Sequence, residues 1–476
     1  MIVKWTKKYF WELLVVSVLV FVGLIFRLKG ISTNHSFWSD EALVSAFSRE
    51  IVLGRASLWE SLTVFHYQRL QVVTAALSFM IFGVSEWSAR LPSVFWGSIG
   101  IIFAYLVARK YSNKWGGYLA AFLYTFLQLN LAHATQAKPY AALETLFLMA
   151  IYFSEKHLLT TLLVATVATL YNYIGVITFF PLLLQLLFRV KWKELGVFFG
   201  VLGLVSIVIL GRFLHIDVIL RFFDPQYNWT TYLRELFWRQ FAFISLPATF
   251  GLFLIKDKKI FWGIALGILA LLFSWNFIFY SRNLRYLMPV FGILTVLFGI
   301  FWGKVGELLY KKPALVCLTV MALIFAGGYK IVRKPSVYYT PNADFFADVQ
   351  NADYKTFFKL TYEKFPDFDN TAVFSNLQDA YVWYAHYKPT ALFKIGNLPP
   401  YIETQSGLVV YPDLRYFMAE MKKYPKGFVV AEDWQSILPE DVKDYVKKNL
   451  KLELRVESMS VSPEEKWPLE LYSWGM

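Results

Sequence analysis

The sequence has few charged residues and a single cysteine. Of its 476 residues, 17% are charged and 57% are hydrophobic, whereas a soluble globular chain carries about 25% charged residues. The lone cysteine, Cys317, lies in an apolar run, which excludes an internal disulfide and a Cys-based metal site or redox pair. The sequence also lacks a Gly-rich phosphate loop, an internal repeat and a low-complexity segment. The scarcity of charge instead indicates a membrane protein.

The charges that are present are mostly basic, with a net charge of +13. Before about residue 330, most of the lysines lie in short loops between apolar runs, a pattern typical of membrane topology signals and of attraction to anionic lipid. We therefore predict membrane lipid, and not nucleic acid, as the partner of this charge. The aromatic content of 19% is in keeping with spans that carry interfacial Trp and Tyr belts.

The apolar runs predict about eleven transmembrane helices. A helix needs roughly 20 apolar residues to cross the hydrocarbon layer. The first run follows Lys4, Lys7 and Lys8 and lacks a small-residue cleavage site, so we interpret it as an uncleaved span. The runs at 141–154 and 158–171 are short, so one of them could be tilted or partly re-entrant. The runs are 10–28, 92–109, 115–132, 141–154, 158–171, 173–189, 194–212, 236–255, 260–280, 286–303 and 313–331.

The segment Gln68–Gly83 is apolar but too short for an ordinary span. Gln71, Thr74 and Ser78 fall on one face of a helix, and Leu70, Val73, Leu77, Met80 and Ile81 supply an apolar face. This pattern favours a helix that lies in the membrane surface. It would belong to a first outer loop over residues 29–91.

Charge counting predicts which side of the membrane each loop faces. With Gln68–Gly83 on the surface, the loops assigned to the cytoplasm hold 16 Lys or Arg in 37 residues, and the outer loops hold 12 in 104. If Gln68–Gly83 crossed, the Lys-rich loops would face outward, against the positive-inside tendency. Eleven spans from a cytoplasmic N-terminus leave the C-terminus outside.

The composition changes after about Lys330, where charged residues become frequent and long apolar runs end. We predict a transmembrane domain over 1–331 and a soluble α/β domain over 332–476, on the non-cytoplasmic side. Strands are expected near 372–374, 408–411, 428–431, 452–456 and 469–472, with helices over 414–424 and 439–449.

Two adjacent acids, Asp40 and Glu41, stand soon after the first span, in the stretch Phe37-Trp38-Ser39-Asp40-Glu41-Ala42. Acids beside a membrane surface are costly unless they are solvated, paired or used. Ser39 or Asp40 could also cap a helix that starts near Glu41, whose dipole would favour the acids. The two interpretations are compatible, because a helix N-terminus can present an acid rigidly.

Two further polar clusters lie in predicted outer loops. Lys138 and Tyr140 follow the third span, and Lys138 could either extend its ammonium to the membrane surface or meet a phosphate. Arg282 and Arg285 lie before the tenth span, which begins at Tyr286, and these two arginines run against the positive-inside trend. Arginine matches phosphate well through bidentate contacts, although a structural pairing with acids of other loops is the alternative.

Other charged positions are more simply structural. Glu86 and Arg90 are four residues apart and could pair along one helix. The histidines of the outer loops match no metal motif, so no metal ligands are predicted; they are His35, His66, His133 and His215.

The order of these motifs resembles the GT-C superfamily of polyprenyl-phosphate-sugar-dependent glycosyltransferases. The acid pair is followed by a surface helix, a Glu-x-x-x-Arg-Leu-Pro stretch over 86–92, the Lys138-x-Tyr140 element and an Arg-Tyr-Leu-x-Pro turn over 285–289. Within the superfamily the chain is similar to the family 39 group, which includes protein O-mannosyltransferases and lipid A aminoarabinose transferases. The resemblance covers about residues 1–330 and is strongest over 37–92, and the outer domain is similar to tails of many such enzymes.

The resemblance implies the transfer of a hexose or pentose from a polyprenyl phosphate, with inversion at the anomeric carbon. Asp40 and Glu41 would be the catalytic acids, with Asp40 as the base that takes the acceptor proton. Lys138, Arg282 and Arg285 would stabilise the departing lipid phosphate, with Tyr140 and Tyr286 beside them. The chain departs from the family pattern in carrying Lys138 where Arg is usual, Glu144 as the nearest further acid of the second loop, and Tyr173 where a His is often found.

The expected partners are a polyprenyl-phosphate-linked sugar, a glycan, lipid or protein acceptor of the cell envelope, and membrane lipid. No cofactor is required by this chemistry, although a divalent metal is compatible with it. The main alternative is a transporter or flippase for a lipid-linked or polar solute. Such proteins usually place charges at mid-membrane and within internal repeats, whereas these clusters lie at one predicted face. A non-catalytic scaffold whose outer domain binds an envelope partner is a second alternative.

Overall fold

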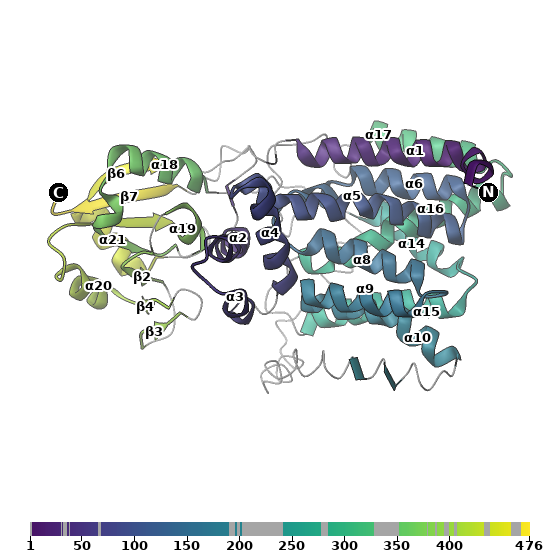
Figure 1. The fold of residues 1–476 in the computed structure, drawn as a ribbon. Coiled ribbons are helices and arrows are strands. Elements are labelled where there is room, and N and C mark those ends of the chain that lie inside the picture. Colours follow the sequence, from purple (N-terminus) through teal and green to yellow (C-terminus); the bar gives the residue numbers. More distant parts are fainter. Residues whose placement is uncertain are drawn as a thin grey trace.

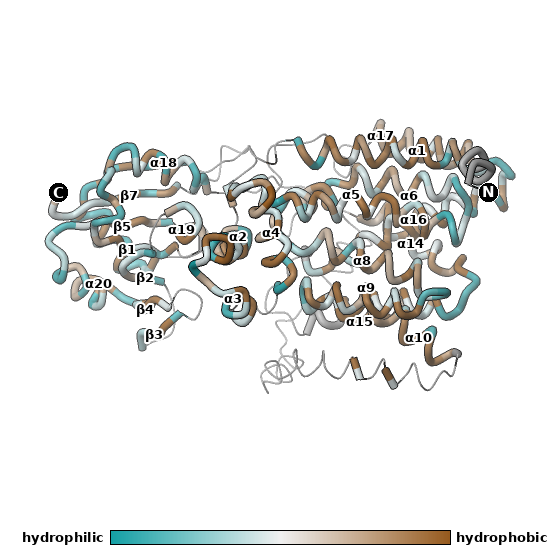
Figure 2. The backbone as a smooth tube through the Cα atoms, in the orientation of Figure 1, coloured by the Kyte–Doolittle hydropathy of each residue, from teal (hydrophilic) through white to brown (hydrophobic). Residues whose placement is uncertain are grey.

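The protein consists of a long helix bundle, three short helices across one end of it, and an α/β domain beyond them (Figure 1). The structure, a computed structural model, describes residues 2–29, 31, 36–37, 39–64, 68–189, 196–197, 200–201, 241–277, 284–327, 352–377, 379–385, 388–394, 399–403, 407–432, 438–457 and 468–476. Figure 2 shows the bundle as predominantly hydrophobic, with hydrophilic stretches concentrated in the C-terminal domain and in connections at the opposite end.

The bundle helices follow the predicted apolar runs closely. Within the described residues, three stretches are long and apolar enough to cross a membrane, namely Tyr9–Leu28, Glu86–Tyr111 and Met288–Leu308, and shorter apolar helices accompany them. The bundle comprises α1 (Ile2–Leu28), α5 (Glu86–Tyr111), α6 (Lys114–Phe126), α7 (Gln128–Ala134), α8 (Tyr140–Phe153), α9 (Leu158–Tyr171), α10 (Phe179–Arg189), α14 (Ala242–Phe253), α15 (Lys258–Phe277), α16 (Met288–Leu308) and α17 (Pro313–Gly327), with the 3₁₀ helices η2 (Tyr173–Thr178) and η3 (Leu284–Leu287).

The predicted run at 115–132 differs from the structure, and the run at 194–212 lies largely outside the described residues. The run at 115–132 is divided into α6 and α7, because Leu127 adopts an extended conformation between them, with φ −60° and ψ 120°. The run at 194–212 lies outside the described residues except for 196–197 and 200–201. The number of spans therefore stays a prediction, while the integral membrane character is supported by the apolar helices.

Glycines allow the central helices α6 and α16 to pack backbone to backbone. A Cβ atom on Gly116 would lie 2.6 Å from the carbonyl oxygen of Gly299, and one on Gly303 would lie 2.9 Å from the Cα of Gly116. Small residues at helix contacts permit such close approach in membrane bundles, where packing replaces the hydrophobic effect. α16 is thereby fixed at the centre of the bundle, and the segment that precedes it, η3, is fixed with it.

The first outer loop forms α2 (Ser39–Val52), α3 (Leu58–Val64) and α4 (Arg69–Phe82). Figure 1 shows these helices between the bundle and the C-terminal domain. α4 buries polar and apolar residues together on one side and exposes apolar residues on the other. The polar Gln71 and Ser78 are buried, and the hydroxyl of Ser78 donates a 2.6 Å hydrogen bond to the Ser88 carbonyl. Met80 and Ile81 are 70% and 72% exposed, an outward apolar face that suits contact with lipid.

The C-terminal domain contains one seven-stranded sheet in the order β3-β4-β2-β1-β5-β7-β6. The five predicted strands are present, and β2 and β3 were not predicted. The strands are β1 (Ala372–Ser375), β2 (Ala391–Phe393), β3 (Tyr401–Ile402), β4 (Val409–Tyr411), β5 (Gly427–Glu432), β6 (Lys451–Val456) and β7 (Leu469–Trp474). The helices are α18 (Tyr354–Lys364), α19 (Asp379–Tyr384), α20 (Leu414–Met421) and α21 (Glu440–Asn449), with the 3₁₀ turn η4 (Phe368–Asn370).

The centre of this sheet is parallel and its flanks are antiparallel. β1 pairs in parallel with β2 and β5, and β4 pairs in parallel with β2, while β3, β6 and β7 run antiparallel to their neighbours. The central strands are covered on both faces, in keeping with their continuous apolar sequences. One of the two cores, which includes Phe358, Tyr381 and Leu471, continues into Phe37, Phe79 and Ala137 next to the bundle. The domain is thus joined to the end of the bundle by a shared core.

Candidate functional site

The adjacent acids Asp40 and Glu41 lie in the first turn of α2, where the helix dipole favours negative charge. The helix begins at Ser39, two residues before the predicted start near Glu41. The two acids have different surroundings: the side chain of Asp40 is 32% exposed, and that of Glu41 is 0% exposed. Successive helical residues point about 100° apart, so one can reach a cavity while its neighbour is buried.

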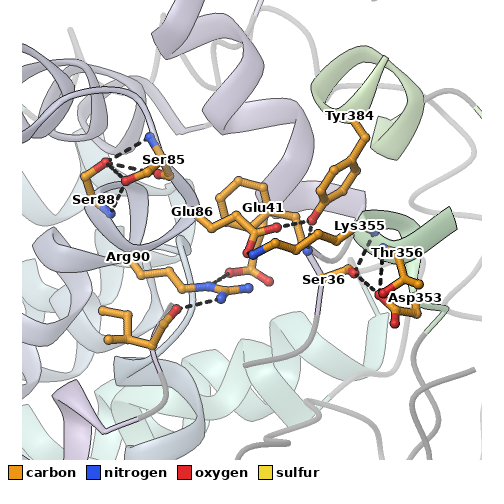
Figure 3. Close-up of polar contacts among 12 residues, drawn as sticks. Ser36, Glu41, Ser85, Glu86, Ser88, Arg90, Asp353, Lys355, Thr356 and Tyr384 are labelled. Atoms are coloured by element: carbon orange, nitrogen blue, oxygen red, sulfur yellow. Dashed lines mark hydrogen bonds and ion pairs between the residues drawn. The ribbon is translucent and has the colours of Figure 1, made fainter. Parts of the chain in front are cut away.

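The carboxylate of Glu41 joins three segments of the chain. Its Oε1 accepts a 3.2 Å hydrogen bond from Nε of Arg90 and a 2.7 Å hydrogen bond from the backbone N–H of Ala137. Arg90 is also fully buried, donates a 2.9 Å bond to the Ile31 carbonyl, and lies 4.9 Å over the ring of Phe37. Figure 3 shows the bonds of Arg90 to Glu41 and to the carbonyl. Because every partner is buried, this cluster fixes the start of α2 against α5 and the segment before α8.

Asp40 lies next to Lys138, one of the cations predicted to meet a phosphate. The Nζ atom of Lys138 lies 3.5 Å from Oδ2 of Asp40, and the side chain of Lys138 is only 1% exposed. The carbonyl oxygen of Lys138 accepts a 3.0 Å bond from Ser93, which holds the backbone of this segment against α5. Lys138 therefore does not extend its ammonium into solvent, and the more accessible partner of the pair is the carboxylate of Asp40.

The predicted cluster before α16 contacts the cluster of Lys138 and Tyr140 through aromatic rings. The ring of Tyr140 lies 6.2 Å from that of Tyr286 and 5.2 Å from the imidazole of His133. Arg285 precedes Tyr286 in η3, and Arg282 lies outside the described residues. Asp40, Lys138, Tyr140 and Tyr286 are thus brought to the same end of the bundle, next to the C-terminal domain.

The C-terminal domain takes part in the site through Tyr384. Its hydroxyl oxygen accepts a 2.6 Å bond from the backbone N–H of Phe37 and donates to the carboxylate of Glu86 (Figure 3). Lys355 adds an ion pair to Glu86 at 3.4 Å. Burial and the negative charge of Glu86 raise the pKa of Tyr384 well above its usual range, so the hydroxyl stays a donor. The ion pair of Arg90 is with an acid of α2, so the predicted i, i+4 pair with Glu86 is replaced by longer-range partners.

Hydrogen bonds of two further residues, Ser36 and Arg49, fasten the domain to the segment before α2 and to α2 itself. The hydroxyl of Ser36 donates a 3.1 Å bond to Asp353 and accepts a 3.0 Å bond from the N–H of Lys355 (Figure 3). Arg49 donates to the carbonyl oxygens of Trp383 and Val382 at 3.0 and 2.9 Å. The sequence carried no local signal for these contacts, because the partners lie more than 300 residues apart.

Glu144 lies inside the bundle on α8, where its side chain is 1% exposed. It faces α16 at Gly292, whose missing side chain leaves the room, since a Cβ there would lie 2.4 Å from Cγ of Glu144. Tyr173 begins η2, in the connection between α9 and α10. Among the described residues, no three His, Cys, Asp or Glu side chains lie close enough together to hold a metal ion. In the described part of the site, the partly exposed carboxylate of Asp40 lies beside the cation Lys138.

Comparison with solved structures shows that the fold is similar to those of ArnT and of an archaeal oligosaccharyltransferase. The structure of ArnT from Cupriavidus metallidurans in the apo state superposes with a TM-score of 0.60 at 13% identity, covering 96% of this chain and 97% of that chain. The same protein bound to undecaprenyl phosphate matches with a TM-score of 0.56 at 14% identity, covering 98% of each chain. An oligosaccharyltransferase from Archaeoglobus fulgidus, tethered with an acceptor peptide, gives 0.53 at 13% identity over 90% of this chain and 70% of that chain.

A sequence family also matches part of the chain. Residues 72–216 match the dolichyl-phosphate-mannose-protein mannosyltransferase family, a segment that includes Lys138 and Tyr140 and begins after the acid pair. No curated protein sequence matches the chain significantly. In sequence, residues 72–216 of this integral membrane protein are thus similar to the protein mannosyltransferases, and the fold of the chain is similar to that of ArnT.

Proposed function

We propose that the protein is an inverting glycosyltransferase that moves a sugar from a polyprenyl-phosphate donor to an acceptor of the cell envelope. The acceptor is a glycan, a lipid or a protein. In the reaction the acceptor oxygen or nitrogen attacks the anomeric carbon, the bond from that carbon to the phosphate oxygen breaks, and the lipid phosphate departs. The observation that carries the proposal is the pair of a partly exposed Asp40 and a buried Lys138, at the end of the bundle where the loops of the site converge.

Asp40 is the general base. A carboxylate must take the proton of the acceptor as the new bond forms, and it needs access to that proton. Asp40 has that access at 32% exposure, whereas Glu41 has none. Glu41 is therefore assigned a positioning role: its bonds to Arg90 and to the N–H of Ala137 set the orientation of the first turn of α2 and hence of Asp40.

The departing phosphate is stabilised by cations. Its negative charge grows as the glycosidic bond breaks, and preorganised positive groups in a site of low polarity lower the barrier to that step. Lys138 is held at this place through Ser93, and Arg282 and Arg285 come from the loop before α16. Lys138 can release Asp40 and meet the phosphate as the carboxylate takes up the acceptor proton, because the pair carries a net charge only after that transfer. Tyr140 and Tyr286 line the same region.

The undecaprenyl phosphate bound to ArnT and the acceptor peptide tethered to the oligosaccharyltransferase support this choice of partners by analogy. We propose that the site and the C-terminal domain face away from the cytoplasm, because the Lys-rich loops lie at the other end of the bundle. No metal is needed in this scheme, since a single phosphate leaves and the cations are supplied by side chains.

The test is an Asp40→Asn variant, purified with the full chain and assayed with radiolabelled lipid-linked sugars extracted from the source membranes. Transfer should fall by at least about a hundredfold, because a general base usually contributes about 10²- to 10⁴-fold. Donor binding should persist, since the substitution keeps the size of the side chain. Glu60→Gln is the matched control, because Glu60 is an exposed acid of α3 at the same end of the molecule, and it should keep full activity.

The same variant distinguishes the transporter or flippase alternative. A transporter would move the lipid-linked sugar across a vesicle membrane without forming a glycosylated product. Undiminished transfer by Asp40→Asn would remove Asp40 from the mechanism. Movement of the donor without any product from the unmodified protein would replace the glycosyltransferase proposal with the transporter.

A further inference from the structure

A second polar site lies at the opposite end of the bundle. A cavity of about 580 Å³ opens there between α1, the connection from α5 to α6, and the connection from α8 to α9. Its lining includes the cations Arg109, Lys110, Lys114 and Lys156 and a single carboxylate, Glu12. The charge count predicts that this end faces the cytoplasm. The cavity is distinct from the candidate active site, which lies next to the C-terminal domain (Figure 1).

The acids in and beside this cavity are already neutralised by partners. Glu12 forms an ion pair with Arg109 at 2.7 Å and accepts a hydrogen bond from the hydroxyl of Tyr105. Glu155, next to the cavity, pairs with Lys110 at 3.0 Å and accepts a 2.6 Å bond from the hydroxyl of Tyr111. Each of these carboxylates is thus neutralised by its own cation, Arg109 or Lys110, and does not neutralise the remaining lysines of the lining.

Two lining cations, Lys114 and Lys156, have no carboxylate within ion-pair distance in the described parts of the chain. Lys114 begins α6, a helix of 13 residues, and Asn113 caps its N-terminus through the N–H groups of Trp115 and Gly116. The positive end of the α6 dipole therefore adds to the charge of the two lysines. Concentrated positive charge at a cavity wall favours a ligand with a phosphate or a similar anion.

The cavity borders a lipid-facing surface. Leu159 and Leu163 follow the lining residue His157 on one face of α9 and are 80% and 63% exposed. On the α1 side, Phe10 and Trp11 immediately precede Glu12 and are 54% and 72% exposed. Such large exposed apolar side chains are covered by acyl chains in a membrane. An anion that reached the lysines from the membrane would have a place for its apolar tails, which a soluble phosphate does not need.

We propose that this cavity binds the phosphate head group of an anionic membrane lipid, with Lys114 and Lys156 as the principal contacts. Basic pockets between transmembrane helices on the cytoplasmic side are suited to such head groups. Lysines at this side of a membrane also serve as topology signals, but a topology signal requires only charge in a loop. A built cavity with neutralised acids, two cations without carboxylates and flanking apolar faces predicts selective, saturable binding instead.

The test is native mass spectrometry of the full chain in detergent, titrated with phosphatidylglycerol or phosphatidylcholine. The unmodified protein should bind phosphatidylglycerol in preference. The double variant Lys114→Gln, Lys156→Gln should bind it roughly thirtyfold more weakly, which corresponds to about 1 kcal/mol for each lysine near an anionic lipid. The matched control is Lys256→Gln, Lys258→Gln, which removes two exposed lysines from another loop predicted to lie on the same side, and its affinity should stay within about twofold.

A charge-keeping variant, Lys114→Arg, Lys156→Arg, should retain most of the binding and guards against a loss caused by misfolding. Equal weakening in the cavity variant and in the control would overturn the proposal, because binding would then depend on total charge alone. A third arm adds inorganic phosphate at millimolar concentration. Displacement of phosphatidylglycerol by that phosphate would reject a lipid as the source of the anion, and persistence of the bound lipid would support it.

Discussion

The two ends of the helix bundle each hold an Arg–Glu ion pair in different surroundings. Next to the C-terminal domain, Arg90 and Glu41 lie 3.2 Å apart and both side chains are 0% exposed. At the opposite end, Arg109 and Glu12 lie 2.7 Å apart and are 36% and 18% exposed. The first pair is bonded on several sides by backbone groups, while the second lines an open cavity.

The difference shows how the two ends can serve different purposes. A buried pair is stable only if each charge keeps its partners, so its geometry is fixed. A partly exposed pair gains less from its contact and loses less when the contact is broken. The buried pair is thus suited to holding Asp40 in one position, and the exposed end is suited to exchanging an anion with the membrane.

Glu41→Gln should give the largest effect on stability. Removing one charge leaves Arg90 buried without its counter-charge, which costs about 3–5 kcal/mol in comparable pairs. Glu12→Gln, the equivalent change at the other end, should cost only about 0–1 kcal/mol. The measurement is the thermal unfolding midpoint of each variant in detergent, with wild type alongside.

A double variant sharpens this comparison. Glu41→Leu combined with Arg90→Met replaces the buried pair with apolar groups, and such replacements are often neutral in stability. It should therefore be more stable than Glu41→Gln and still impaired in transfer, because the N–H of Ala137 loses its acceptor. Equal midpoints for Glu41→Gln and Glu12→Gln would contradict the contrast between the two ends.

Tyr384→Phe should lower stability by less than Glu41→Gln, and its effect should be confined to the end of the bundle next to the C-terminal domain. The variant removes the hydroxyl that links the N–H of Phe37 to the carboxylate of Glu86. Leaving such buried groups short of a partner costs about 1–3 kcal/mol. Since Phe37 packs beside the start of α2, sugar transfer should also fall, while lipid binding in the cavity at the far end should be unchanged.

Tyr416→Phe is the control for this prediction. Tyr416 stacks on Tyr411 in the same domain, and its hydroxyl makes no hydrogen bond within the described residues. Its midpoint should stay within about 0.5 kcal/mol of wild type. If Tyr384→Phe behaved like Tyr416→Phe in both stability and transfer, the C-terminal domain would not position the segment that carries Asp40 through this hydroxyl.

The helices of the bundle could be predicted from the sequence because their signal is local. The run at 141–154 corresponds to α8 (Tyr140–Phe153), within one residue at each end. The break at Leu127 was missed, because no Gly or Pro marks it. β2 and β3 were missed because strands of three and two residues are too short to show an alternating pattern.

The candidate site was predictable in its residues and not in its bonds. Asp40, Lys138 and Tyr286 stand out because charged and aromatic groups recur at the same ends of apolar runs. The partners of Glu41 and Glu86 could not be found, since Arg90 and Tyr384 lie 49 and 298 residues away along the chain. A single sequence does not show which distant residues meet in space. The predicted pair of Glu86 and Arg90, four residues apart, is replaced by the pairs of Arg90 with Glu41 and of Glu86 with Tyr384.

Glu453 differs from both Arg–Glu pairs, because its own side chain is buried while the side chains of its cations are exposed. The side chain of Glu453 is 4% exposed, while its partners Lys364 and Lys451, each at 2.8 Å, are 47% and 75% exposed. Hydrogen bonds from these lysines lower the pKa of Glu453 to about 2. The carboxylate binds a proton less readily in the folded protein than in the unfolded chain, where its pKa is about 4.3.

The stabilisation from Glu453 is therefore present above about pH 4.3 and is lost as the pH falls toward about 2. Because the lysines are exposed to solvent, we expect it to be about 1 kcal/mol or less, the smallest of these effects. Unfolding midpoints of wild type and Glu453→Gln should differ slightly at neutral pH and converge in acid. A gap at neutral pH as large as that of Glu41→Gln would mean that burial of the acid alone, and not of both partners, sets the strength of these pairs.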